Sequence, residues 1–326
     1  IAQHADRANR SPAGTSSAAA KSRAATTAAG AATNSASGPG SDPASESRSQ
    51  SSPSSLLPAA TAAPGGIAWG TSVMRYGGET YAQAWARDQQ QLAPEIVRYY
   101  IPGTNGPRWP TTTGSMPLAI SFRLLPAEVL SGARDAQLTA FFAATPRLTY
   151  WSYWHEPEDD IARGTFTAAE YRAAWAHIAG IARASGKPLR ATLILMGYTA
   201  QAYSHRTWSD YYPGSSVVDV LAWDAYAWNG NDTPESVYGP VRAASAQAGK
   251  PWAVAETGVS SVHVPDRARR QALLTAMSHY LATAQQAPTF VTYFDSDPAG
   301  DPAGFQSWNV SHDPAAAAAW RAGQSG

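Results

Sequence analysis

Two glutamates at the ends of short apolar segments are the residues best suited to chemistry. Glu156 follows the β-branched and aromatic run 149–154 and stands directly before Pro157. Proline cannot continue a central strand or a helix, so Glu156 is expected where a strand gives way to a loop. Glu256 ends a second apolar run, 251–256, and a Thr-Gly turn follows it. Each carboxylate alone could be an ion-paired acid at a strand end, so the choice depends on the rest of the chain.

A pair of carboxylates on opposite walls of a cleft is what cleavage of a glycosidic bond requires. One is kept protonated by apolar surroundings and donates to the leaving oxygen, while the other attacks the sugar or activates water. Glu156 suits the acid, because Trp and Tyr residues and His155 neighbour it in the sequence. Glu158 is the alternative acid, since it shares strand parity with Glu156. Glu256 suits the nucleophile.

The elements around these residues alternate between short apolar runs and helical stretches from Gly65 onward, the pattern of a parallel α/β architecture. Eight strands are predicted, at 67–73, 95–101, 118–123, 148–154, 190–196, 218–226, 252–256 and 289–294. The clearest helix covers 168–184, opened by a capping box of Thr167 and Glu170, and a second covers 266–284.

Eight such units in about 260 residues match the size of a (β/α)8 TIM barrel. A doubly wound open sheet is the alternative, but it would need a Gly-rich phosphate turn after its first strand. Met74-Arg75-Tyr76 stands there instead. The sequence therefore predicts a (β/α)8 catalytic barrel over 65–326.

In such a barrel the active site lies at the carboxyl ends of the strands. Glu156 would end the fourth strand and Glu256 the seventh, and buried carboxylates are costly unless they are paired or functional. Hydrogen bonds to Glu256 would keep it ionised. The supporting residues predicted around the two glutamates are His155, Tyr226, Arg98, Arg123 and Asp224.

These segments together resemble clan A glycoside hydrolases, and most of all family 26, the family of β-mannanases and related endo-glycanases. The similarity covers roughly residues 65–326. His155-Glu156 resembles the acid/base motif of the family, and the segment from Lys250 to Gly258 resembles its nucleophile strand. Further similar pieces, in the same order, are Gly132 with Asp135, Tyr212-Pro213-Gly214, Val218-Asp219 and Asp224-Ala225-Tyr226.

The resemblance implies an endo-acting retaining β-glycanase, with Glu156 as acid/base, Glu256 as nucleophile and Tyr226 orienting the nucleophile. One segment departs from the family pattern. Where family members continue Met-Asn-Gly after His-Glu, this chain has Pro157-Glu158-Asp159-Asp160. Mannan-, xylan- and glucan-type polysaccharides therefore all stay open as substrates.

Aromatic residues are numerous, with twelve Trp and fifteen Tyr, all of them after residue 68. Aromatic faces stack on the C–H surfaces of sugars, although Trp and Tyr also fill cores. An aromatic residue on a loop after a strand, or beside the end of the fourth strand, is expected to stack on sugar rather than fill the core. The predicted substrate-binding residues are Trp154, Trp228, Trp308, Tyr76, Trp109, Trp208 and His205.

The composition excludes several classes of function. The formal net charge is zero, which argues against binding nucleic acid or an anionic membrane. No apolar run approaches the ~18–20 residues of a membrane span, and without cysteine there is no disulfide or thiolate chemistry. We expect a monomer with no cofactor and no metal.

The first 64 residues differ from the rest, because they contain no Phe, Trp or Tyr and consist mainly of Ala, Ser, Thr, Gly and Pro. Such a segment cannot bury enough apolar area to fold, so a disordered linker or stalk is predicted over 1–64. The chain starts at Ile1 rather than Met, which would fit a removed export signal and a secreted protein.

Two other functions remain open from the sequence. A non-catalytic carbohydrate-binding or surface barrel would keep the cleft but not turnover. A metal-assisted hydrolase could use His155, Asp224 and Glu256. The acidic segment 295–301 also hints at calcium, but its spacing departs from an EF-hand loop, so a turn-rich loop is preferred.

Overall fold

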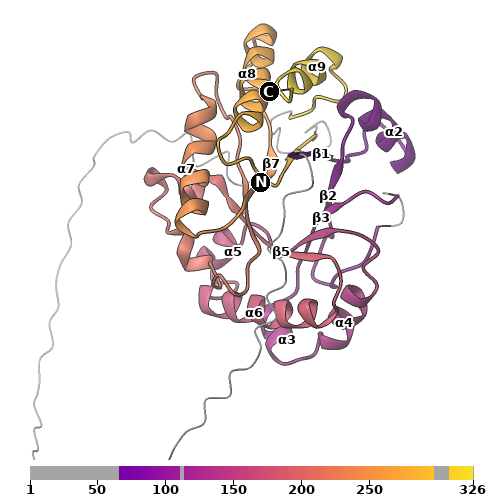
Figure 1. The fold of residues 1–326 in the computed structure, drawn as a ribbon, viewed down its shortest axis with the longest axis vertical. Helices are drawn as coiled ribbons and strands as arrows, with labels where there is room; N and C mark the ends of the chain where they lie inside the picture. The colour runs from indigo at the N-terminus through magenta and orange to yellow at the C-terminus, as the bar shows by residue number, and fades with distance from the viewer. Residues whose placement is uncertain (1–65, 111–113, 297–307, 326) are drawn as a thin grey trace, which may run out of the picture. The chain divides into compact units, whose positions relative to one another are not determined.

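The computed structural model describes residues 66–110, 114–296 and 308–325, so the linker predicted over 1–64 lies outside the described residues. In the described part, eight parallel strands follow one another in sequence order around a closed barrel, and β1 pairs with both β2 and β8 (Figure 1). The predicted (β/α)8 barrel is confirmed. Closure pairs both edges of each of these eight strands.

All eight predicted strands are present, with ends that differ by a few residues. They are β1 Ala68–Ser72, β2 Ile96–Tyr100, β3 Leu118–Phe122, β4 Thr149–Tyr153, β5 Leu189–Met196, β6 Val220–Asp224, β7 Trp252–Thr257 and β8 Phe290–Tyr293. Most of their residues are buried on both faces, which is typical of parallel strands covered by helices.

The helices lie between the strands in the sequence and surround the barrel (Figure 1). They are α2 Tyr81–Leu92, α3 Pro126–Leu130, α4 Asp135–Ala143, α5 Glu158–Ala162, α6 Ala168–Ala184, α7 Pro234–Gln247, α8 Arg267–Ala282 and α9 Pro314–Ala322. Three short 3-10 turns follow β5, namely η1 Gly197–Ala200, η2 Ala202–Ser204 and η3 Trp208–Tyr211.

Helix α6 has the predicted bounds, and its sequence explains them. Thr167 and Glu170 form the expected capping box, each side chain accepting from the backbone N–H of the other residue. The apolar face packs on β4, where the rings of Trp175 and Trp151 stack with centroids 4.9 Å apart. This contact fixes β4, whose carboxyl end leads to Glu156.

Helix α8 follows the same logic within the predicted span. Asp266 caps its first turn by accepting from the N–H of Arg269 at 2.7 Å. Leu273, Leu274 and Met277 are buried, as the helical spacing predicts. Among the described residues, no helix combines the length and apolar character needed to cross a bilayer.

Two glycines provide a matched test of the packing. A Cβ at Gly70 in β1 would lie 2.0 Å from the carbonyl oxygen of Ile96, whereas a Cβ at the exposed Gly180 in α6 would meet nothing within 4 Å. We expect Gly70→Ala to destabilise the barrel by more than about 2 kcal/mol, because backbone must move. Gly180→Ala should stabilise it by about 0.5–1 kcal/mol through helix propensity. Urea unfolding of both variants measures this, and equal effects would contradict the packing at β1.

Candidate active site

Glu156 and Glu256 lie at the same rim of the barrel, at the carboxyl ends of β4 and β7. Both are buried, with 8% of Glu156 and none of Glu256 exposed. Asp224, at the end of β6, is the register partner of Glu256 across the β6–β7 pair. The strand ends therefore bring three carboxyl groups to one side of the barrel.

Glu256 receives two hydrogen bonds, one from β2 and one from the residues that follow β6. Arg98 on β2 donates to Oε1 at 3.3 Å, and the hydroxyl of Tyr226 donates to Oε2 at 2.6 Å. Arg98 is itself fully buried and donates to the hydroxyl of Ser121 at 2.7 Å. Donors of this kind stabilise negative charge on a carboxylate. The bonds that a nucleophilic carboxylate would need are thus present.

The surroundings of Glu156 favour its protonated form. Burial raises the pKa of the Glu156 carboxyl to about 7, and the negative charge of Glu256 adds to this rise. The cations Arg123 and Arg98 oppose it. A carboxyl group with this pKa holds its proton up to neutral pH and can release it there, as a general acid and base must.

The backbone that carries Glu156 is strained. Trp154 and Glu156 have φ angles of 47° and 51°, in the left-handed region that residues with a side chain seldom adopt. The Trp154 N–H donates to the carbonyl of Phe122 at 2.8 Å, and the Glu156 N–H donates to the carbonyl of Ile194 at 3.1 Å. Strain of this kind persists only where the surrounding structure holds it, and it is concentrated at functional sites.

Asp224 and His155 complete the polar part of the site. Burial, then the charges of Glu256 and Glu156, raise the pKa of Asp224 well above its ordinary value. Within the described chain, neither carboxyl oxygen of Asp224 has a hydrogen-bond partner. Burial and the charge of Arg98 lower the pKa of His155, so its imidazole is neutral.

Aromatic rings lie beside Glu256. The Tyr226 ring is 4.7 Å from that of Trp308 and 6.0 Å from that of Trp228, measured between centroids. Trp308 is 4% exposed and Trp228 is half-buried. A Cβ at Gly258 would lie 2.9 Å from Trp308 Cε3, so the Thr-Gly turn after Glu256 leaves room for this indole.

Two of the tryptophans predicted to bind substrate make contacts with other residues of the protein. Trp154 is 4% exposed, and its indole N–H donates to Asp160 at 2.7 Å. Trp109 stacks on the Phe141 ring at 4.3 Å and donates to the Phe141 carbonyl at 2.9 Å. The guanidinium of Arg123 lies 5.3 Å from the centroid of the Trp154 ring. The structure therefore places Arg123 beside Trp154.

The remaining predicted residues lie on loops after β1 and β5. Tyr76 donates from its hydroxyl to the Asp295 carbonyl at 2.8 Å. Trp208 is half-buried, with its ring 5.6 Å from that of Tyr212, and His205 is exposed. In the described part of the chain, the side-chain donors to Glu256 are Arg98 and Tyr226, and none of these three side chains is among them.

Tyr100 is a further residue of the site that sequence reasoning missed. Its ring lies under the guanidinium of Arg98 at 4.2 Å and 5.7 Å from the ring of His155. Burial, then the charge of Glu256, raise the pKa of its hydroxyl. The signal was available, because residues two apart on a strand share a face and Arg98 was already a candidate.

A metal centre finds no support in the described residues, where no three His, Cys, Asp or Glu side chains are grouped to hold an ion. This includes the set His155, Asp224 and Glu256. Asp297 and Asp301 of the calcium-like segment lie outside the described residues.

Comparison with known proteins supports the fold. The sequence matches no model of a protein family. It also matches no curated protein. Among solved structures, a family 39 glycoside hydrolase from Bacteroides cellulosilyticus superposes with a TM-score of 0.56 at 13% identity, over 80% of this chain and 64% of that one.

A modular endo-β-1,4-mannanase of family 26 from Cellulomonas fimi gives a TM-score of 0.50 at 18% identity, over 71% of this chain and 66% of that one. A family 128 endo-β-1,3-glucanase from Amycolatopsis mediterranei gives 0.48 at 15% identity, over 78% and 100%. This chain thus shares its fold with glycoside hydrolases of families 39 and 26, and no single family is resolved.

The raised pKa of Glu156 makes stability depend on pH. In the unfolded chain the pKa returns from about 7 to its ordinary 4.5. Between these values the unfolded chain binds fewer protons, so stability falls as the pH rises through this window. Glu156→Gln removes this loss, and we expect it to stabilise the protein at pH 8 by up to about 3 kcal/mol and to have little effect at pH 4.

Urea unfolding at pH 4, 6 and 8 measures this difference. Glu235→Gln is the control, because the Glu235 side chain is 67% exposed and its replacement should not show the same pH dependence. A stability difference for Glu156→Gln that is constant from pH 4 to pH 8 would contradict the raised pKa.

Proposed function

We propose that the protein is a retaining glycoside hydrolase that cleaves a β-linked polysaccharide, with Glu156 as acid/base and Glu256 as nucleophile. The observation that carries the proposal is the contrast between the two glutamates at one barrel rim. Arg98 and Tyr226 donate to Glu256, whereas burial raises the pKa of Glu156 to about 7. Glycoside hydrolysis needs this division between a charged and a protonated carboxyl group.

In the first step, a carboxylate oxygen of Glu256 attacks the anomeric carbon as the bond to the leaving oxygen breaks. Glu156 gives its proton to that oxygen, and the sugar becomes an ester of Glu256. In the second step, Glu156, now a carboxylate, takes a proton from water. The water oxygen displaces Glu256 from the anomeric carbon, so the configuration is retained and both glutamates return to their starting states.

The neighbouring side chains support these steps. The Tyr226 hydroxyl orients Glu256 through its 2.6 Å hydrogen bond, and Arg98 balances its charge. Half-buried Trp228 lies beside Tyr226 and is suited to stacking on a sugar ring, and buried Trp308 packs against both of these rings. Neutral His155 places no positive charge beside the acid.

The proposed substrate is a mannan-, xylan- or glucan-type polymer cut within the chain. The family 26 protein that shares the fold is an endo-β-1,4-mannanase, which makes mannan the first polymer to test. Since such polymers lie outside cells, we propose that the protein is secreted and acts as a monomer without a cofactor.

Replacement of the nucleophile is the most direct test. Glu256→Ala should lower the release of reducing ends from mannan, xylan and β-glucans by about 10⁴-fold or more, because no ester can form. Circular dichroism should show an intact barrel, and Glu235→Ala, at an exposed site, should keep full activity.

Proton NMR of the first product released by the unmodified protein should show the β anomer. Binding of a polymer by the unmodified protein without hydrolysis would instead support a carbohydrate-binding barrel.

The hydroxyl of Tyr226 has a matched control. Tyr226→Phe removes its hydrogen bond to Glu256, and we expect kcat to fall by about 10- to 100-fold, the range for a hydrogen bond to a charged group. Tyr280→Phe removes a hydroxyl that donates at 2.6 Å to Glu235 on the surface, and it should leave kcat unchanged. Equal kcat values for the two variants would remove Tyr226 from the mechanism.

A further inference from the structure

The acidic segment Glu158-Asp159-Asp160 comes directly after Glu156 and Pro157. Each of its side chains contacts another part of the protein. Asp160 accepts from the indole N–H of Trp154, and Asp159 pairs with Arg206. Glu158 lies deepest, with no exposed surface. These contacts fix the segment directly after the loop that carries Glu156.

Glu158 joins this loop to the end of β5. Its Oε1 accepts from the N–H of Met196, the last residue of β5, and from the hydroxyl of Thr199 in η1, both at 2.8 Å. These partners are 38 and 41 residues away in the sequence. The carboxyl oxygen takes the place that a carbonyl of a neighbouring strand would fill.

The attachment continues the pairing of β4 with β5. The register runs from Thr149 opposite Leu189 to Trp151 opposite Ala191. Further along, the Glu156 N–H bonds the carbonyl of Ile194 and the Glu158 side chain bonds the N–H of Met196. The two bonds reach alternate residues of β5, and Pro157 lies between the two residues that make them. They therefore hold the chain at Glu156 itself and again two residues after it.

Glu156 needs such support because of its backbone. Its φ of 51° costs about 1–2 kcal/mol for a residue with a Cβ, so without fixed neighbours the turn would relax. A relaxed turn would carry the carboxyl group away from its place. A displacement of about 1 Å can cost 10²-fold in rate.

Glu158 is not placed to be the proton donor itself. Its Oε1 is occupied by two donors, and its Oε2 is buried without a hydrogen-bond partner in the described part of the chain. Burial raises the pKa of Glu158 to about 8, and the charge of Glu156 adds to this. At pH 7 Glu158 is therefore neutral and sets no second negative charge beside Glu156. The other titratable groups that interact with it are Asp224, Arg206, Tyr171 and Tyr211.

We propose that Glu158 is a positioning residue for the acid/base, which holds the strained turn of Glu156 against the end of β5 and η1. This inference rests on the proposed glycosidase function. It explains what the departure from the family pattern after His155-Glu156 does in this chain.

The first experiment compares Glu158→Gln with Glu158→Leu. The amide oxygen of glutamine still accepts from Met196 and Thr199, so kcat should stay within about threefold and its pH profile should not move. Leucine leaves both donors without an acceptor, and kcat on the natural polymer should fall by about 10²-fold with KM within about threefold.

Substrates with different leaving groups distinguish a defect in proton donation from a defect in nucleophilic attack. The dinitrophenolate of a dinitrophenyl glycoside departs without a proton, so Glu158→Leu should lower kcat/KM for this substrate, which reports the first step, by less than about tenfold. Equal losses of kcat/KM on the activated glycoside and on the polymer would overturn the inference, because the defect would then not lie in proton donation. Loss of activity in Glu158→Gln equal to that in Glu158→Leu would also overturn it.

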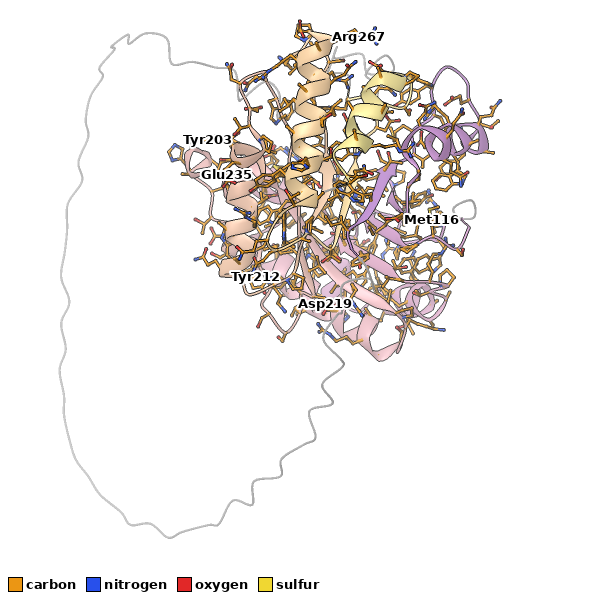
Figure 2. The ribbon with its side chains drawn as sticks, turned by 45° about the horizontal axis from the view of Figure 1, so that its top comes forward. Met116, Tyr203, Tyr212, Asp219, Glu235 and Arg267 are labelled. Atoms are coloured by element: carbon orange, nitrogen blue, oxygen red, sulfur yellow. The ribbon has the colours of Figure 1, made fainter. Side chains whose placement is uncertain are left out.

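Asp219, directly before β6, offers a structural control, because its carboxylate also accepts a hydrogen bond from a backbone N–H of β5. Its Oδ2 accepts from the N–H of Ala191 at 2.7 Å, near the start of β5, and Figure 2 labels Asp219 in the lower part of the body. Asp219→Leu should lower Tm as a lost hydrogen bond does but keep kcat. If it lowers kcat as much as Glu158→Leu does, the role of Glu158 is merely structural.

Hydrogen exchange separates failure of this inference from failure of the proposed function. In Glu158→Leu, the amides of Met196 and Glu156 should exchange at least about tenfold faster, while the amide of Ala191 should not change. Unchanged exchange at Met196 and Glu156 would overturn the inference. This readout holds even if the unmodified protein hydrolyses no polymer, a result that would overturn the proposed function alone.

Discussion

The buried ion pair between Arg98 and Glu256 is the interaction on which the site depends. Both side chains are fully buried, and removing two charges from water costs several kcal/mol each unless further hydrogen bonds compensate. The structure supplies these bonds: Arg98 donates to the Ser121 hydroxyl, and the Tyr226 hydroxyl donates to Glu256. They join β2, β3, β7 and the end of β6, so the charge is maintained by the closed barrel as a whole.

The charge of Glu256 in turn shapes its neighbours. Beyond the effect of burial, it raises the pKa of Glu156 and Asp224. It also raises that of the Tyr100 hydroxyl. A carboxylate that accepts from two donors, beside carboxyl groups whose pKa is raised, is the arrangement that two-carboxylate hydrolysis needs. The left-handed turn at Glu156 and the Glu158 attachment extend this logic to Glu156, the proposed acid, which contacts β5.

Much of the fold could be predicted because its signals are local. Alternating apolar runs and helical stretches indicated the eight strands, and the capping box of Thr167 and Glu170 indicated where α6 begins. The aromatic residues were harder. Trp154 and Trp308 both follow or end strands, yet the first packs around Asp160 and Phe166 and the second lies against Tyr226. A side chain's environment depends on neighbours distant in sequence.

The sequence by itself determined that the chain builds a barrel and that acids stand at the ends of its fourth and seventh strands, because periodicity and proline stops act over a few residues. Only the tertiary structure decided which donors reach Glu256, since Arg98 is 158 residues from it. It also decided that Glu158, two residues from Glu156, points to the backbone of β5. A carboxyl group's role follows from the groups that barrel closure brings beside it, and no local pattern specifies those.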